Sequence, residues 1–244
     1  MSSLLAVGLL PRRRLGLGLR ERALGLLRCL LRCLVLPLCI APSIGAQAQE
    51  PEPNQLVAQA LASARSGDLA RLQQALEAGA SVNTRSRNGD SLLLIAIKGE
   101  QTPYALATLA RGADPQRPNA AGVTPLMAAA FQGNTAVLRA LLERHVALDP
   151  VDRVQKSAMV YAAGAGRSEA VSLLLDAGVA VNARYDAQLT ALMWAAGMGQ
   201  VETVRLLLQR GADSALTDDR GKNAQQMARD AGHAAVAELL APGH

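Results

Sequence analysis

The chain has few residues that could carry out chemistry, and their spacing assembles neither a catalytic nor a metal-binding site. Cys29, Cys33 and Cys39 all lie within the first 48 residues. The remainder therefore offers no thiol for a disulfide, a thiolate metal site or a cysteine nucleophile. His145, His233 and His244 have no sequence neighbours that would complete a ligand set or a catalytic triad. The sequence therefore predicts no catalytic residue, no cofactor and no metal.

Two short segments resemble phosphate-binding motifs but lack the context that such motifs need. The segment GAGRSEA at 164–170 contains a lone G-x-G with no strand before it, so dinucleotide binding is not expected. The segment DRGKN at 219–223 lacks the upstream glycine of a phosphate loop, and the pair Asp218 and Asp219 is interpreted as solubilising. We therefore do not expect an enzyme.

The basic character of the chain is confined to its N-terminal segment. The whole chain has 25 basic and 20 acidic residues and an isoelectric point near 9.6. Residues 1–48 hold seven arginines and one glutamate, which leaves 18 basic and 19 acidic residues, a net charge of −1, in the rest. This balance disfavours a nucleic-acid partner, because such partners require a positive face.

The N-terminal segment has the three parts of a secretory signal. A positively charged stretch precedes an apolar run, and AQA at 46–48 places small residues before a predicted cleavage site after Ala48. We therefore predict a signal peptide at 1–48, a linker at 49–54, and a periplasmic protein with no membrane span after cleavage. Signal anchoring stays open as the weaker alternative, because Pro37 and Pro42 interrupt a run shorter than the roughly 20 apolar residues of a span. The true start codon also stays open.

Beyond the signal, the sequence repeats with a period of 33 residues. Three columns of residues recur at this spacing, each with its own expected role. Polar residues that can cap a helix N-terminus form the first column, Ser91, Thr124, Ser157, Thr190 and Asn223. Residues that can end a helix form the second, Gly79, Gly112, His145, Gly178 and Gly211. Glycines of the turn between two helices form the third, Gly67, Gly133, Gly166, Gly199 and Gly232.

Each unit thus contains a cap, a short Ala-rich helix, a glycine turn, a Leu-rich helix and an extended tip. This resembles the ankyrin repeat, and the unit 119–151 is closest, with Gly122, Thr124 and Pro125 in the family's positions. The resemblance implies an all-α solenoid of stacked helix-turn-helix units with short hairpin-like tips. The predicted units are an N-terminal capping repeat at 54–85, repeats at 86–118, 119–151, 152–184 and 185–217, and a C-terminal capping repeat at 218–244.

Two departures from the family pattern lead to structural expectations. The histidine that follows the helix start in the family is replaced in four units, so its inter-repeat hydrogen bond is lost. The replacements are Leu94, Met127, Val160 and Met193. In the unit 86–118, Gly99 stands one residue early, which predicts a locally irregular turn between the two helices.

The resemblance implies a concave face, formed by the first helices and the hairpin tips, that binds a partner. Phe131, Tyr161 and Trp194 come from three consecutive units and are predicted to gather on this face. An alternative stays open, in which Tyr161 and Trp194 only fill gaps between repeats. The predicted contact residues are Phe131, Tyr161, Trp194, Met198, Arg153, Lys156, Tyr185, Arg87, Asn88, Arg220 and Lys222.

The sequence therefore predicts a non-catalytic protein–protein interaction module that is monomeric by itself and binds a protein partner through the concave face and the tips. The alternative is an accessory, protective or inhibitory subunit of one exported enzyme. The two differ in the partner, because the alternative requires one tight partner whose activity or stability it changes. The identity of the partner is not encoded in any motif of the chain.

Overall fold

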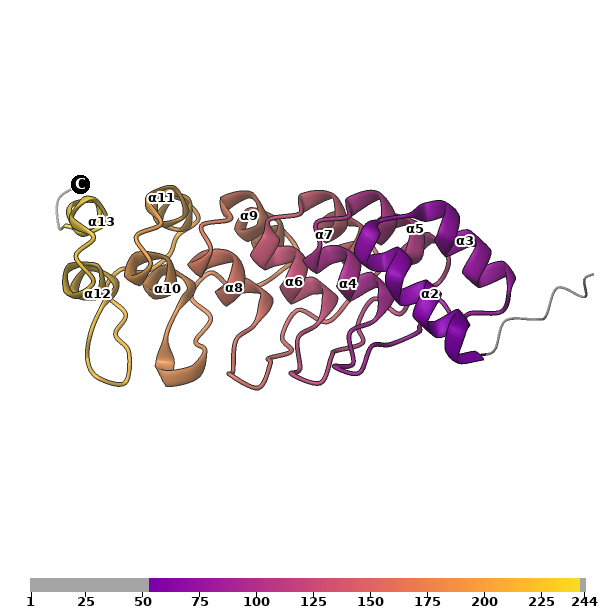
Figure 1. The fold of residues 1–244 in the computed structure, drawn as a ribbon. Helices are drawn as coiled ribbons and strands as arrows, with labels where there is room; N and C mark the ends of the chain where they lie inside the picture. The colour runs from indigo at the N-terminus through magenta and orange to yellow at the C-terminus, as the bar shows by residue number, and fades with distance from the viewer. Residues whose placement is uncertain (1–52, 242–244) are drawn as a thin grey trace, which may run out of the picture. The chain divides into compact units, whose positions relative to one another are not determined.

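The structure is a computed structural model that describes residues 53–241. Within these residues the chain forms twelve α-helices in six antiparallel pairs, together with one short 3-10 helix, η1 (Asp186–Gln188) (Figure 1). The α-helices are α2 (Pro53–Ser66), α3 (Leu69–Glu77), α4 (Leu92–Lys98), α5 (Thr102–Ala110), α6 (Pro125–Gln132), α7 (Thr135–Leu142), α8 (Ala158–Gly164), α9 (Ser168–Asp176), α10 (Ala191–Gly197), α11 (Val201–Gln209), α12 (Ala224–Asp230) and α13 (Ala234–Leu239). The described part contains no sheet, and the predicted all-α solenoid of stacked helix-turn-helix units is confirmed.

The first helix of each pair, from α4 onward, begins at the predicted capping residue. Each of the five side chains accepts a hydrogen bond from the backbone N–H three residues later. The donor–acceptor distance is 3.1 Å at Ser91 and 3.3 Å at Thr190. At Thr124 and Thr190 the capping N–H also contacts the sulfur of the methionine three residues on, at 3.4 and 3.5 Å. Met127 and Met193 thus give these helix starts a second, weaker contact in place of the family's histidine.

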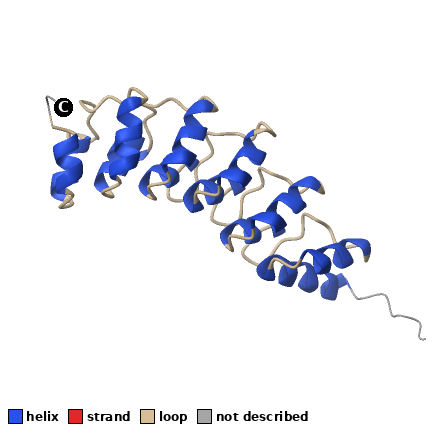
Figure 2. Ribbon diagram, turned by 90° about the horizontal axis from the view of Figure 1, so that it is seen from above, coloured by secondary structure: helices blue, strands red, loops and turns tan. Residues whose placement is uncertain are grey.

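The pairs stack so that first helices pack on first helices and second helices on second helices (Figure 2). The core is made of leucines from both rows and of alanines in the first helices. Ala129, Ala162 and Ala195 are fully buried at equivalent positions of α6, α8 and α10. Their small side chains let neighbouring helices approach closely, as the repeat pattern predicts.

The turn between α4 and α5 is regular, so the prediction of an irregular turn there is wrong. Gly99 has an ordinary negative φ, and Glu100 adopts the left-handed conformation (φ 58°) that glycine adopts in the other units. The Gln101 N–H donates to Ala96 O at 2.8 Å, as the Asn134 N–H donates to Ala129 O in the next unit. The hydrogen bonds of the turn fix its shape, and Glu100 adopts that shape at a conformational cost.

The predicted signal peptide at 1–48, its cleavage site and most of the linker lie outside the described residues. The linker prediction is wrong for Pro53 and Asn54, because both belong to α2. Pro53 occupies the first helical position, where its missing N–H costs nothing. No helix among residues 53–241 is long and apolar enough to cross a membrane.

Candidate functional site

Four of the predicted contact residues meet on the face formed by the first helices and the hairpin tips. We call Phe131, Tyr161, Trp194 and Lys156 the aromatic patch. The Phe131 and Tyr161 rings pack edge to face, with centroids 5.9 Å apart and an interplanar angle of 84°. The Lys156 ammonium nitrogen lies 4.8 Å from the Trp194 ring centroid and 5.8 Å from that of Tyr161. Three consecutive repeats thus contribute to one continuous surface cluster.

The members of the patch differ in how much of each side chain reaches solvent. Phe131 is 49% exposed, whereas Tyr161 and Trp194 are half-buried and pack against the core. Tyr161 and Trp194 thus fill gaps between repeats, as one alternative holds, and part of each side chain also stays exposed, so the binding alternative remains a prediction. A half-buried aromatic ring is a rigid contact, since little entropy is left to lose on binding.

Tyr161 links the patch to the hairpin tip of its own repeat. Its hydroxyl donates a 2.5 Å hydrogen bond to the Asp152 carboxylate, which is buried and also accepts from the N–H groups of Val154 and Lys156. Burial, followed by the hydrogen bond to Asp152 and the negative charge of Asp152, raises the pKa of Tyr161 from 10.0 to about 12. The tip that carries Lys156 is therefore held in register with the aromatic rings.

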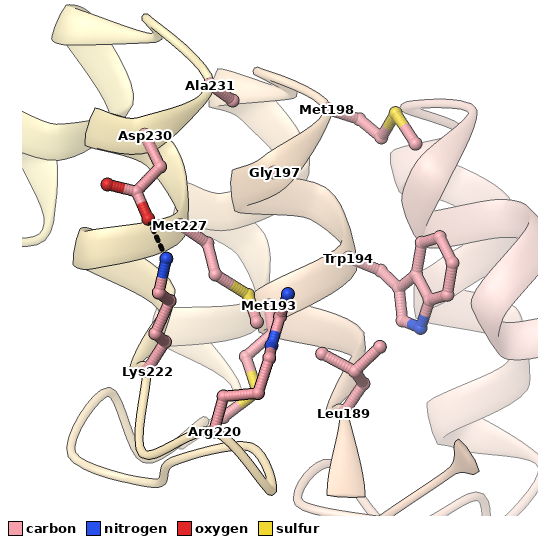
Figure 3. A pocket seen from close by; sticks show the side chains of 10 residues that line it. All are labelled: Leu189, Met193, Trp194, Gly197, Met198, Arg220, Lys222, Met227, Asp230 and Ala231. Carbon is pink, nitrogen blue, oxygen red and sulfur yellow. Dashed lines mark hydrogen bonds and ion pairs between the residues drawn. The ribbon is translucent and has the colours of Figure 1, made fainter. Parts of the chain in front are cut away.

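Beside the patch, a groove of about 380 Å³ lies between the last two repeats (Figure 3). We call it the C-terminal groove. Its lining residues come from α10, from α12, from the loops that precede these helices and from the residues that directly follow them. Apolar side chains line its middle and one side, and charged side chains line its rim. They are Leu189, Met193, Trp194, Met198 and Met227 for the apolar part, and Arg220, Lys222 and Asp230 for the rim. Trp194 belongs to both surfaces and makes them continuous.

The rim charges of the C-terminal groove are already paired. Arg220 contacts the buried Asp218 carboxylate at 2.8 Å, and Lys222 contacts Asp230 at 2.5 Å. Asp218 also accepts backbone hydrogen bonds from Arg220 and Lys222, which fixes this tip as Asp152 fixes its own. The side chains predicted here, Arg220 and Lys222, thus have defined positions.

The remaining predicted contact residues lie apart from this cluster. Arg87 and Asn88 border a separate depression between the first two repeats. Arg153 is exposed at its tip, where its backbone N–H donates to Ala121 O. Tyr185 is half-buried and packs against the core.

The Tyr185 hydroxyl is turned away from solvent and has no hydrogen-bond partner among the described residues. Burial raises its pKa, and the neighbouring Ser157 side chain partly offsets this without meeting hydrogen-bond geometry. Tyr185 therefore does not present its hydroxyl to a partner.

The sequence interpretation missed an apolar hairpin tip. Val154 is 63% exposed and Val151 is also exposed, and both belong to the tip that carries Lys156 of the patch. The signal was present in the sequence, because Val151 stands where three of the other four tips carry Arg or Thr, and Val154 where they carry Asn, Arg or the smaller Ala.

The hairpin tip that carries Val154 also lacks a backbone hydrogen bond to one of its two neighbouring tips in the described structure. Neighbouring tips are linked by a backbone hydrogen bond, such as Arg153 N–H to Ala121 O and Asp219 N–H to Ala187 O. The equivalent bond from Asp186 to Val154 is not formed in the described structure. The row of tips is therefore interrupted between the repeats 152–184 and 185–217.

The side chains that could bind a metal do not gather into one site within residues 53–241. No group of three or more His, Cys, Asp or Glu side chains in this range could hold a metal ion. His145 occupies a helix-stop position with φ 52°, and His233 lies over Gly199 in the preceding repeat.

Comparison with known proteins agrees with this architecture. A model of the family described as ankyrin repeats (3 copies) matches three overlapping stretches, residues 60–152, 95–185 and 159–244. The chain belongs to the ankyrin repeat family. Ankyrin repeats are generally non-catalytic modules for protein–protein interaction. The ankyrin repeat protein EF0377, known from a crystal structure, is 28% identical with a TM-score of 0.68, over 77% of this chain and 98% of EF0377. No curated protein matches the chain.

Proposed function

We propose that this ankyrin repeat protein is a non-catalytic interaction module, exported to the periplasm, that binds a protein partner through its first-helix face and hairpin tips. The observation that carries the proposal is the clustering of exposed apolar side chains on this one face. Phe131 is 49% exposed beside half-buried Tyr161, Met198 is 50% exposed beside half-buried Trp194, and Val154 is 63% exposed on the tip that carries Lys156. Aromatic anchors at the centre of a contact surface dominate the affinity of protein interfaces.

Charge supports a protein partner over a nucleic acid. The net charge of residues 49–244 is −1, and two of the cations on this face, Arg220 and Lys222, are paired with carboxylates. A phosphate backbone requires several unpaired cations along one surface.

The partner-binding part of the proposal is tested by affinity capture from the periplasm. The double variant Phe131→Ala with Arg153→Glu changes the proposed face. The matched control, Leu69→Ala with Arg205→Glu, changes an exposed leucine of α3 and an exposed arginine of α11 by the same chemistry. We expect the wild type and the control to recover the same partner, and the first variant to recover at least several-fold less. Equal recovery by all three proteins would contradict the proposed face.

The export part of the proposal follows from the signal-like residues 1–48 and is tested separately. Cell fractionation should place the chain in the periplasm, and its measured mass should correspond to a chain that begins at Gln49. A full-length chain in the cytoplasm would overturn the export proposal and leave the interaction module intact.

A further inference from the structure

The C-terminal groove and the aromatic patch form one continuous apolar surface with the ammonium group of Lys156 at its edge. The groove contributes the accessible side chains of Met198 and Met227, together with the buried Met193, and Trp194 joins it to the patch. Methionine side chains adapt their shape to an incoming apolar group, since they are unbranched and polarisable. The groove therefore accepts a large apolar side chain without requiring one particular shape.

Lys156 supplies the charge at the edge of this surface. Its ammonium group has no carboxylate within ion-pair distance among residues 53–241, whereas Arg220 and Lys222 each have one. The Asp152 carboxylate next to it is occupied by the Tyr161 hydroxyl and by backbone N–H groups. Because the ammonium group lies over two aromatic rings, it is positioned by cation–π contacts and remains available to a carboxylate from outside.

The floor of the groove has room for a bound chain at Gly197. This residue is the last residue of α10, it does not have positive φ, and a Cβ atom there would meet nothing within 4 Å. Glycine costs a helix about 1 kcal/mol relative to alanine, so neither the backbone nor the packing of this chain favours it. Its missing side chain leaves open space next to Trp194 and Met198.

We propose that this surface binds an extended segment of the protein partner in which a large apolar residue stands close to an aspartate or glutamate. The apolar side chain occupies the C-terminal groove over Gly197 and between the methionines. The segment then crosses Trp194, and its carboxylate pairs with Lys156. This inference rests on the proposed function, because it names the chemistry of the partner at the same face.

The test selects short random peptides displayed on phage against the full chain and measures the binding of the enriched peptides. Trp194 is the only tryptophan of the chain, so its fluorescence reports directly on occupancy of the surface. We expect enriched peptides to pair an acidic residue with an aromatic or aliphatic one, and to shift the Trp194 emission when the synthetic peptides are titrated.

Two variants and two matched controls locate the binding site. Gly197→Leu fills the groove and Lys156→Glu reverses the charge, and each should weaken binding by about tenfold or more. Ala136→Leu on α7 and Arg205→Glu on α11 make the same kinds of change on the second-helix side and should leave the affinity within about twofold. All four proteins should keep the wild-type helical circular dichroism, because none of the changes touches a buried side chain.

The outcomes separate this inference from the proposed function. Enriched peptides without acidic residues, or peptides that bind Gly197→Leu and Lys156→Glu as tightly as the wild type, overturn the inference. So does self-association of the wild type that Gly197→Leu abolishes, since the occupant would then be a second copy. If capture from the periplasm still depends on Phe131 and Arg153 in these cases, the proposed function stands without the inference. If the peptides bind as expected but no protein partner depends on this face, the proposed function fails.

Discussion

Tyr161 is the residue at which the surface chemistry and the fold of this ankyrin repeat protein are most closely joined. Its ring packs against Phe131, the Lys156 ammonium group lies over the ring, and its hydroxyl donates a hydrogen bond to Asp152 of the hairpin tip. A change at this side chain therefore alters both the patch and the position of the tip. The hydroxyl is also the group whose protonation can be followed directly.

The first prediction concerns the ionisation of this phenol. Tyr161 keeps its proton in the folded chain up to about pH 12, whereas an unfolded tyrosine loses it near pH 10.0. The folded state therefore binds more protons than the unfolded state between these pH values. The contribution of Tyr161 to the free energy of unfolding is complete below pH 10 and is lost as the pH rises towards 12. In ultraviolet difference titrations, Tyr161→Phe should lack the phenolate signal that appears near pH 12 in the wild type.

The other two tyrosines provide the control for this titration. Tyr104 and Tyr185 also have raised pKa values, chiefly because they are buried. The native chain should therefore show little phenolate at pH 10, whereas the chain unfolded in denaturant should titrate there. A native phenolate signal near pH 10 of one full tyrosine would contradict the burial of these side chains.

At the residue scale, the sequence predicts which side chains gather but not how they are oriented. The period of 33 residues places Tyr161 and Trp194 at equivalent positions, and their proximity to Phe131 follows from the stacking. The inward turn of Tyr185 could not be predicted, because Tyr185 occupies the column in which Asp152 and Asp218 fix their tips. A tyrosine cannot make those short contacts, and its ring is buried against the core instead.

At the scale of single elements, the turns between paired helices differ in their conformational free energy. Glu100 adopts φ 58° where the equivalent residue of the other turns is glycine. A side chain in this conformation costs roughly 1–2 kcal/mol, part of which is offset because glycine has more freedom in the unfolded chain. We predict that Glu100→Gly raises the free energy of unfolding by roughly 0.5–1 kcal/mol, measured by urea denaturation.

Glu100→Ala separates the backbone effect from the loss of the glutamate side chain. Alanine pays the same penalty at positive φ, so this variant should gain little or no stability. Stabilisation of the alanine variant as large as that of the glycine variant would instead assign the effect to the carboxylate.

The helix starts give a second prediction at this scale. Thr190 is buried and caps α10, the helix that carries Trp194. Thr190→Ala leaves the Met193 N–H without its cap and should lower the free energy of unfolding by about 1 kcal/mol. Thr135→Ala, at the first position of α7, removes the same atoms without removing a cap bond and should change the stability by less than half as much. Equal effects of the two changes in thermal denaturation would show that the cap contributes nothing.

The helix starts could be predicted from the sequence, whereas the conformations of some turns and tips could not. The spacing of Ser91, Thr124 and Ser157 predicts the helix starts, because a capping oxygen acts on N–H groups a few residues away. The conformation of Glu100 is decided by hydrogen bonds that close the turn around it. The position of Gly99 in the sequence therefore did not predict the shape of this turn. The open side of the Val154 tip likewise depends on the neighbouring tip, which local pattern does not specify.

At the scale of the whole array, stability arises from contacts between neighbouring repeats. First helices pack on first helices and second on second, so no pair buries its apolar side alone. Side chains add further links between units, such as the Gln200 amide that donates to Gly164 O and the Arg167 guanidinium that donates to Phe131 O. A central repeat has two such interfaces and a terminal repeat has one.

This difference predicts that the same change acts locally at the end of the array and globally at its centre. Leu138 in α7 is fully buried, and Leu240 after α13 is nearly so. Replacing either by alanine removes the same buried atoms, and Leu138→Ala should cost about 2–5 kcal/mol. For Leu138→Ala we expect a lower midpoint of the main unfolding transition and faster hydrogen exchange throughout residues 53–241. For Leu240→Ala we expect faster exchange in α12 and α13 only, because the terminal repeat can open without its neighbours.

Since the C-terminal groove lies between α10 and α12, Leu240→Ala should also weaken peptide binding at Trp194 while the central repeats stay protected. Uniform acceleration of exchange by both changes would mean that the array unfolds as one cooperative unit, and the groove would then be as stable as the core.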